Sequence, residues 1–406
     1  MISLDEARAL LLDGVAPLPM EEVELSAADG RVLAVDLIAP FDQPAQNRSA
    51  MDGYAVAAGP VEAGTRLRVI GTAFAGAPFS GALQPGTAVR IGTGGVVPPD
   101  AKRILMQEAV ERQGEDIIIR EAPGEARFIR SAGGDFGTGQ TLIEAGEQLW
   151  PAHLGLAAAA GYARLPVRRP PRMFIFASGD EIREPGQGLD AGQTFNSAAY
   201  AIEALVRRWG GEPRREAILP DEHARARDHI AKARQGADVL VFIGGASVGE
   251  RDVLRSVVEE LGATQRFDRV AVQPGKPCWH ARFAGGPLVL GLPGNPASAY
   301  VCAHLLLEPL LAAMTGRKSQ TTLVPAVLLS PMAAGGARET YWRADAALDR
   351  AGRLTVAADP HIDSSLQLPL ARANALIRRS ANEEAAKCGD VVDVILTGPV
   401  ARALSS

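Results

Sequence analysis

The sequence predicts a multidomain protein in which a central α/β domain of three layers is flanked by regions built from β-strands. Residues 169–320 alternate apolar runs of strand length with helical patterns, which is typical of a parallel sheet covered by helices. Residues 46–137 and 321–406 instead contain short strand patterns separated by closely spaced turns. The chain has 406 residues, which is enough for several domains of ordinary size.

The N-terminal part of the chain is expected to be discontinuous. Residues 3–12 form an amphipathic helical pattern, and an alanine-rich helix is predicted at residues 152–160. We expect the second helix to pack on the first. This packing would join residues 1–45 and 138–168 into one N-terminal domain.

Residues 46–137 are expected to form a β-rich insertion domain. Asp52 precedes a glycine in a dipeptide that favours a hairpin turn, Thr93 lies in a glycine-rich turn, and Asp135 lies in a polar loop. On the residues alone, ordinary turns explain these three positions better than a functional site does. The predicted strands are Leu67–Thr72, Thr87–Ile91, Arg103–Gln107, Asp116–Arg120 and Arg127–Arg130.

The strongest local signal of a ligand site is the stretch from residue 238 to residue 252. Val239–Ile243 is an unbroken apolar run, as expected of a strand buried on both faces of a parallel sheet. A glycine-rich turn follows, and a helical pattern opens at Asp252. Such a turn can hold a phosphate or another oxyanion, although close packing would explain its glycines equally well. These glycines are Gly244, Gly245 and Gly249.

Three further polar turns in this domain each follow an apolar run, at residues 178–181, 273–277 and 291–296. In open α/β sheets such turns collect at the carboxyl ends of the strands, where ligands bind. The acidic side chains suit a phosphorylated ligand with a divalent cation, because Mg²⁺ usually takes one or two carboxylates and completes its shell with water and phosphate. They are Asp180, Glu181, Asp252 and Asp221, the last of which could equally be a helix N-cap.

Residues 321–406 are expected to form a C-terminal β-domain. Arg343 is predicted on a strand of this domain and Ser364 in a polar turn. The local sequence pattern alone would assign both residues to the surface. The predicted strands are Thr322–Leu329, Thr340–Ala344, Leu354–Ala358, Ala375–Arg379 and Val391–Leu396.

Composition narrows the function classes. The net charge is −5, which argues against general nucleic-acid binding. Three widely spaced cysteines give no disulfide framework, so we expect a reducing, cytoplasmic location. No signal peptide is expected, and the apolar stretch at residues 301–314 is too short to span a bilayer.

Taken together and in this order, the motifs resemble those of the molybdopterin molybdenumtransferase family over essentially the whole chain. Each motif is weak alone, but the ordered set is highly specific. The motifs are Ser49-Ala50-Met51-Asp52-Gly53-Tyr54-Ala55, Ser178-Gly179-Asp180-Glu181, Gly244-Gly245-Ala246-Ser247-Val248-Gly249, Pro274-Gly275-Lys276-Pro277 and Leu292-Pro293-Gly294-Asn295-Pro296-Ala297-Ser298.

The resemblance implies a molybdopterin-binding α/β domain at 169–320, an insertion domain at 46–137, a linker and dimerisation domain at 1–45 plus 138–168, and a β-barrel-like domain at 321–406. It implies a homodimer whose site lies between the α/β domain of one subunit and the C-terminal domain of the other. The implied reaction uses adenylylated molybdopterin, molybdate and Mg²⁺ and yields molybdenum cofactor and AMP. A separate molybdopterin adenylyltransferase, and downstream molybdoenzymes or nucleotidyltransferases, are the implied partners.

The resemblance also implies roles for individual residues. Catalytic roles fall on Asp52, Thr93, Asp135, Glu181, Asp221, Asp252 and Lys276. Metal ligands would come from Asp180, Glu181, Asp221 and Asp252. Substrate-binding positions are Ser178, Gly179, Asp180, Gly244, Gly245, Ser247, Gly249, Pro277, Pro293, Gly294, Asn295, Ser298, Arg343 and Ser364, with Lys276, Arg343 and Ser364 at the positions that hold molybdate.

The sequence departs from the family pattern at several positions. Gln273 stands where a basic residue usually precedes Pro-Gly-Lys-Pro, so we expect weaker capture of molybdate. Asp135 follows Ala132-Gly133-Gly134 rather than the arginine-glycine-acid pattern, and thus lacks its usual neighbours. The carboxylates and Lys276 remain, which favours an active enzyme.

Two other interpretations stay open at this point. The adenylyltransferase that makes the substrate has a similar α/β domain, but this chain carries extra domains on both sides. A catalytically weak carrier or scaffold that binds molybdopterin and keeps the same fold is the alternative from another functional class.

Overall fold

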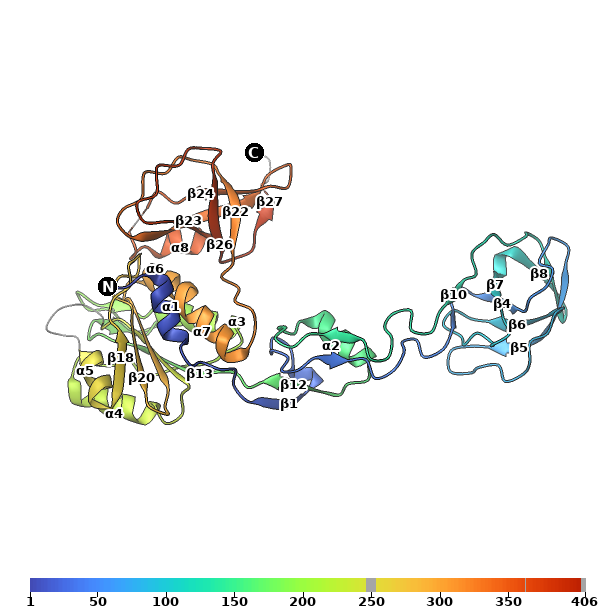
Figure 1. Ribbon diagram of the computed structural model, residues 1–406, viewed down its shortest axis with the longest axis horizontal. Coiled ribbons are helices and arrows are strands. Elements are labelled where there is room, and N and C mark those ends of the chain that lie inside the picture. Colours follow the sequence, from blue (N-terminus) through green and yellow to red (C-terminus); the bar gives the residue numbers. More distant parts are fainter. Residues whose placement is uncertain (246–252, 362, 403–406) are drawn as a thin grey trace.

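The computed structural model describes residues 1–245, 253–361 and 363–402. The molecule is elongated (Figure 1). The α/β domain and the C-terminal β-domain lie together at one end, a small module with the helix α2 (Pro151–Ala159) lies in the middle, and a separate β-domain lies at the far end. Two chain segments connect the middle module to this far domain, one in each direction.

The central sheet has six strands, and its four consecutive strands at one side are parallel. All five residues of β17 are buried, which confirms the expected buried strand at Val239–Ile243. The last two strands run antiparallel. The order is β16 (Glu212–Arg215), β13 (Arg172–Ala177), β17 (Val239–Ile243), β21 (Leu288–Leu292), β20 (Trp279–Phe283) and β18 (Ala263–Phe267).

Helices cover both faces of this sheet and give three layers. Along β17, Val239 and Val241 belong to one core, whereas Leu240 and Phe242 belong to the other, because successive strand side chains point to opposite faces. The first face is covered by α1 (Leu4–Leu12), α3 (Ala198–Arg208), α6 (Pro296–Cys302) and α7 (Glu308–Thr315), and the second by α4 (His223–Ala233) and α5 (Val253–Glu260).

The expected packing of the N-terminal helix against the alanine-rich helix is wrong. Leu4, Ala7 and Leu11 form one apolar stripe of α1, and this stripe is buried in the core of the α/β domain. The helix α2 packs instead on the strand β11 (Thr141–Ile143) and contributes only Ala157 as a buried residue. The sheet of the α/β domain provides enough apolar surface to bury the stripe of α1, whereas α2 is too small to bury it.

The middle module is held together by strands that are distant in the sequence. β1 (Met20–Glu24) pairs antiparallel with β12 (Arg164–Arg168), and β2 (Leu37–Ile38) pairs with β11. The chain therefore leaves this module and returns to it more than a hundred residues later.

The far domain contains a six-stranded sheet with a hydrophobic core on each face. Asp52 and Gly53 do not form the hairpin turn that the dipeptide favours, because β3 (Arg48–Ser49) pairs with β10 (Ile129–Arg130) rather than with β4. A Cβ on Gly53 would lie 1.9 Å from the carbonyl oxygen of Leu105, so close strand packing requires this glycine. The strand order is β7 (Arg103–Met106), β4 (Gly53–Val56), β6 (Thr87–Ile91), β5 (Arg66–Ala73), β9 (Asp116–Ile119) and β8 (Val110–Gln113).

The C-terminal domain is a closed five-stranded barrel. Its ladder runs β23, β24, β22, β26, β25 and closes where β25 pairs again with β23. The short strand β19 (Val272–Gln273) of the α/β domain adds to β23 and ties the two domains together. The strands are β22 (Leu323–Leu328), β23 (Glu339–Leu348), β24 (Leu354–Ala358), β25 (Ala375–Arg379) and β26 (Val391–Leu396).

One helical stretch, Pro296–Thr315, is long and apolar enough to cross a membrane by length and composition. Of its most apolar window, 83% is buried inside the protein, as in a core helix. A π-helical turn, η3 (Ala303–Leu307), lies in the middle of this stretch between α6 and α7.

Candidate active site

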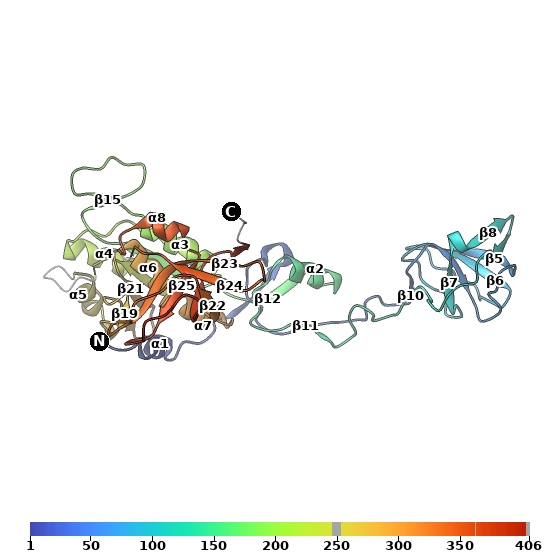
Figure 2. The same cartoon turned by 90° about the horizontal axis from the view of Figure 1, so that it is seen from above.

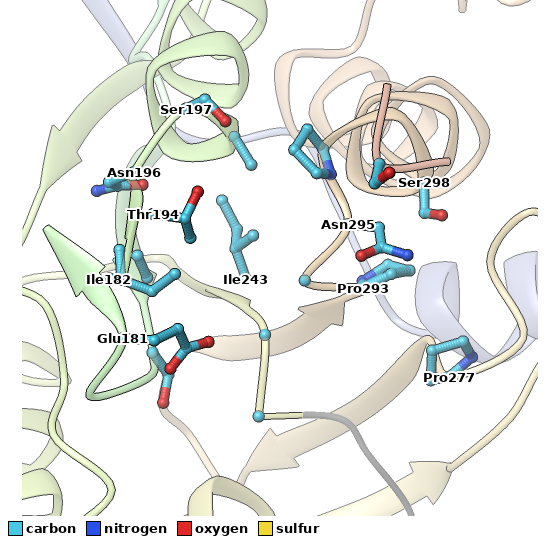
Figure 3. A pocket seen from close by; sticks show the side chains of 18 of the residues that line it. Glu181, Ile182, Thr194, Asn196, Ser197, Ile243, Pro277, Pro293, Asn295 and Ser298 are labelled. Atoms are coloured by element: carbon cyan, nitrogen blue, oxygen red, sulfur yellow. The ribbon is translucent and has the colours of Figure 1, made fainter. Parts of the chain in front are cut away.

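A pocket of about 840 Å³ opens at the carboxyl ends of β13, β17 and β21. In Figure 3, Glu181 lies on one side of this pocket, and Asn295, Ser298 and Pro277 lie on the opposite side. The structure thus brings together ten of the predicted site residues as pocket lining: Ser178, Glu181, Gly244, Gly245, Lys276, Pro277, Pro293, Gly294, Asn295 and Ser298.

Glycines allow the backbone to come close at the base of the pocket. Gly244 and Gly245 have φ values of +90° and +64°. A Cβ on Gly245 would lie 2.6 Å from Leu254 Cδ1, and one on Gly244 would lie 2.9 Å from the carbonyl oxygen of Ser178. The glycines of the turn after β17 are therefore needed for close packing, and they also line the pocket.

The C-terminal domain closes one side of the pocket through the segment 363–367. Asn295 Nδ2 donates to Ser364 Oγ at 3.0 Å, and Gln367 Nε2 donates to Ser197 Oγ at 2.7 Å. Ser365 and Gln367 line the pocket. The resemblance implied that the C-terminal domain of a second subunit takes this place, whereas here the chain's own C-terminal domain does so.

Arg343 holds the segment 363–367 in place through hydrogen bonds to its backbone. Its guanidinium is buried and donates to the carbonyl oxygens of Leu366 and Asp363, both at 3.1 Å, and also to the carbonyl oxygen of His361. Arg343 does not line the pocket. In this structure it positions the segment that carries Ser364.

Lys276 brings positive charge to the pocket from the Pro-Gly-Lys-Pro turn. Across residues 1–245, 253–361 and 363–402, no hydrogen bond or ion pair holds its ammonium group. Arg255 and Arg269 also line the pocket, and sequence reasoning missed both. Arginine supplies nearly all the positive charge of this chain, so neither residue stood out in the sequence.

The position of Lys276 depends on Gly275. This glycine has a φ of +129°, and a Cβ there would lie 2.4 Å from Cys302 Sγ and 2.9 Å from Val272 Cγ1. We expect Gly275→Ala to displace the turn and to weaken anion binding in the pocket, since the strained backbone and the buried α6 cannot both adjust. Calorimetric titration with molybdate tests this, with Gly285→Ala, at a positive φ in open space, as the control.

The predicted carboxylates are divided between two cavities. Glu181 lines the main pocket, whereas Asp180 lines a neighbouring cavity of about 680 Å³. Asp180 Oδ1 accepts a hydrogen bond of 3.2 Å from the backbone N–H of Asp221. In the part of the chain that the structure describes, no three acidic, histidine or cysteine side chains gather into a metal-binding group.

Ser247, Gly249 and Asp252 lie outside the described residues. Gln273 lies outside the pocket lining, and its Oε1 accepts a hydrogen bond of 3.0 Å from Arg338 Nη2. An arginine of the C-terminal domain thus lies next to the position where the family pattern has a basic residue.

Asp52 directly precedes β4 and Thr93 follows β6. Figure 1 shows these two strands in the far domain, at the opposite end of the molecule from the α/β domain. Thr93 donates to Asp52 Oδ1 from its backbone N–H at 2.7 Å and from its hydroxyl at 3.0 Å. These two hydrogen bonds hold the pKa of the Asp52 carboxyl below its usual value. Asp135 lies in the connection to the middle module, where its backbone N–H donates to the carbonyl oxygen of Gln43.

The wall of the pocket that precedes α3 was not among the predicted site residues. Thr194, Phe195, Asn196 and Ser197 line the pocket, and a long loop before β15 (Thr194–Phe195) projects beyond the body of the domain (Figure 2). Asn196 Nδ2 donates to Glu184 Oε1 at 2.9 Å and so anchors this wall. Its polar residues carry no distinctive spacing that could have marked them.

The fold and the pocket define a multidomain protein with a ligand-binding α/β domain between β-rich domains. Three family models match the chain: the MoeA N-terminal region (domain I and II) at residues 2–161, a probable molybdopterin binding domain at 174–313, and the MoeA C-terminal region (domain IV) at 325–397.

Relatives with assigned names agree with these matches. A molybdopterin molybdenumtransferase from Haemophilus influenzae is 32% identical over 78% of this chain and 79% of its own length, and one from Nostoc is 34% identical over 72% and 68%. The crystal structure of a molybdopterin biosynthesis MoeA protein from Pyrococcus is 28% identical, with a TM-score of 0.83 over 98% of this chain and 100% of that chain. The chain belongs to the molybdopterin molybdenumtransferase family and is an enzyme of that family.

Proposed function

We propose that this enzyme inserts molybdenum from molybdate into adenylylated molybdopterin and releases AMP. The observation that carries the proposal is the pocket itself, in which Lys276 and two arginines provide positive charge around a space of about 840 Å³. Cations fixed in a partly enclosed pocket attract phosphate and molybdate, both of which are oxyanions. The named relatives make molybdopterin the pterin to expect.

The pocket residues would have different roles, which depend on where each residue lies in the pocket. Lys276, Arg255 and Arg269 would hold the anionic groups, while Asn295 and Ser364 would offer an amide and a hydroxyl at the side that the C-terminal domain closes. No side-chain nucleophile is required, because molybdate itself supplies the attacking oxygen. Catalysis would then rest on positioning and on electrostatic stabilisation of the leaving AMP.

The chain offers a partial fit for Mg²⁺. The Glu181 carboxylate lies in the pocket close to Gly179, since an added Cβ at Gly179 would lie 2.4 Å from Glu181 Oε2. Mg²⁺ bound in protein usually needs no more than one or two carboxylates. We propose that Glu181 would hold Mg²⁺ in this pocket, which when bound offsets negative charge on phosphate oxygens.

The test is AMP release by the purified full-length protein from adenylylated molybdopterin, with molybdate and Mg²⁺ varied independently. The proposal expects release that requires both ions. Tight binding of the adenylylated pterin without molybdate-dependent release would overturn it and would support the carrier alternative.

We further propose that the enzyme acts as a cytoplasmic homodimer that receives its substrate from a separate adenylyltransferase and passes its product to molybdoenzymes. In this arrangement Asp52 and Thr93 would serve the pocket of the second subunit, because the elongated chain keeps them away from its own. Asp52 remains charged at neutral pH, since its pKa is lowered.

This arrangement predicts complementation between two inactive variants. Asp52→Asn and Lys276→Ala should each reduce AMP release by about a hundredfold or more. Co-expressed mixtures should recover about a quarter of wild-type activity, because half of the dimers are mixed and each mixed dimer has one intact pocket. Separately purified variants that are not allowed to exchange subunits serve as the control. A mixture that stays inactive despite proven subunit exchange would contradict the assignment of Asp52 to the second subunit's pocket.

A further inference from the structure

A separate, smaller cavity of about 290 Å³ lies at the junction between the α/β domain and the C-terminal barrel. Its walls come from the end of α3, the π-helical turn η3, the linker after α7 and the end of β26. It shares no lining residue with the catalytic pocket.

His304 is the unusual group in this cavity. Its side chain lies on the π-helical turn and is only 5% exposed, and its Nε2 has no hydrogen-bond partner within the described residues. The ring of Trp209 packs edge-on against it at 5.0 Å. A buried polar atom without a partner is costly, and π-helical turns within α-helices are frequent at functional sites.

The charges around the cavity favour an anion with a single charge. Glu308 is already neutralised, because its carboxylate accepts from Arg317 Nη1 and from the backbone N–H of Gln320, each at 2.7 Å, and from Thr321 Oγ1 at 2.8 Å. Arg208, which also lines the cavity, has no acidic partner in residues 1–245, 253–361 and 363–402. The single positive charge of Arg208 therefore remains to pair with an anion that carries one negative charge.

The remaining lining residues are mostly apolar, and Thr397 is the polar exception. Trp209 and Leu396 line the cavity together with Pro399. A ligand that fits all of these groups has a carboxylate for the guanidinium, a compact apolar body, and a polar substituent that can reach an imidazole nitrogen.

We propose that this cavity is a binding site for a small organic carboxylate, held by Arg208 and His304 at the junction of the two domains. Its ligand would contact the α/β domain, the linker and the barrel at once. Binding would therefore stabilise the relative position of the two domains that together form the catalytic pocket. The proposal does not depend on the reaction at that pocket.

The experiment uses benzoate as the probe and the full-length protein. Affinity is measured by calorimetry, and the His304 imidazole is followed by NMR of the histidine-labelled protein, which has six histidines. The His304 signal is assigned by its loss in His304→Gln. We expect a saturable shift of this signal with benzoate and a rise in the melting temperature.

Arg208→Gln should weaken benzoate binding by about tenfold or more, as expected for the loss of a charge-assisted hydrogen bond. Arg207→Gln is the matched control, because Arg207 pairs with Glu203 on the exposed side of the same helix turn. Equal weakening in both variants, undiminished binding in Arg208→Gln, or no saturable shift of the His304 signal would overturn the proposal. Inorganic phosphate that binds as tightly as benzoate, with the same dependence on Arg208, would overturn the choice of a carboxylate.

Discussion

Replacing Lys276 by alanine should reduce molybdate-dependent AMP release by about a hundredfold or more, as the loss of one fixed electrostatic group does in comparable sites. Lys276 lines the pocket, and no contact within the described residues occupies its ammonium group. The charge is therefore available for a bound oxyanion. Lys276→Arg should restore little, because the tight turn at Gly275 leaves the larger planar guanidinium in a different place.

The matched control is Lys232→Ala, which removes an exposed lysine from α4 in the same domain. It should leave both AMP release and its molybdate dependence unchanged. The measurement is the initial rate of AMP release as a function of molybdate concentration. A Lys276→Ala enzyme that keeps its rate at every molybdate concentration would remove Lys276 from the proposed mechanism.

The largest effect on stability is expected for Glu308→Gln. Glu308 and Arg317 form an ion pair of 2.7 Å in which both side chains are only 1% exposed. The substitution leaves the Arg317 charge buried without a counter-charge, which should lower the free energy of unfolding by about 3–5 kcal/mol. Nε and Nη2 of Arg317 already lack hydrogen-bond partners in the described structure, so few other groups can compensate.

The pH dependence provides an independent check. Burial raises the pKa of Glu308, but hydrogen bonds from Ser319 and Gln320 and the charge of Arg317 outweigh burial, and the pKa lies below its ordinary value of 4.5. A lowered folded-state pKa adds stability that is present above pH 4.5 and is lost as the pH falls through the folded pKa. The difference between wild type and Glu308→Gln should therefore shrink below this pH.

Urea denaturation across this pH range measures both effects. The control is Arg353→Gln, which breaks an ion pair with Asp349 in which the arginine is 69% exposed, and which should change stability little. Glu308→Gln combined with Arg317→Met should recover part of the lost stability, because the double variant buries no unpaired charge. Equal stabilities of Glu308→Gln and wild type at neutral pH would contradict the prediction.

Several parts of the architecture could be predicted from local patterns. The strands Val239–Ile243, Leu354–Ala358, Ala375–Arg379 and Val391–Leu396 have the predicted bounds, because short apolar runs between turn residues define strands locally. The turns after β13, β17 and β21 also meet at one pocket, since parallel neighbours place their carboxyl ends together.

The resemblance to a family added what local patterns could not provide. Turn chemistry alone does not distinguish Lys276 from a surface lysine, or Asn295 from any other loop residue. The ordered set of motifs predicted both as site residues, and both line the pocket.

Other features depended on contacts between residues distant in the sequence. The stripe of α1 could have covered either of two surfaces, and only the larger core of the α/β domain buried it fully. The local sequence around Arg343 is the same whether its side chain faces a ligand or donates to backbone carbonyl oxygens. The folded chain shows that it donates to those of His361, Asp363 and Leu366. The pocket arginines Arg255 and Arg269, and the unpaired nitrogen of His304, arise in the same way from the packing of separate elements.

There is a simple physical reason why some features can be predicted from the sequence and others only from the tertiary structure. Backbone preferences and hydrophobic periodicity act over a few residues, so the sequence alone specifies strands, helices and the glycine-rich turns between them. The burial, the hydrogen-bond partners and the charge environment of a side chain depend on elements that meet only in the folded chain. For this protein the tertiary structure therefore decided which polar residues face the pocket, which support it from behind, and which lie far away in the insertion domain.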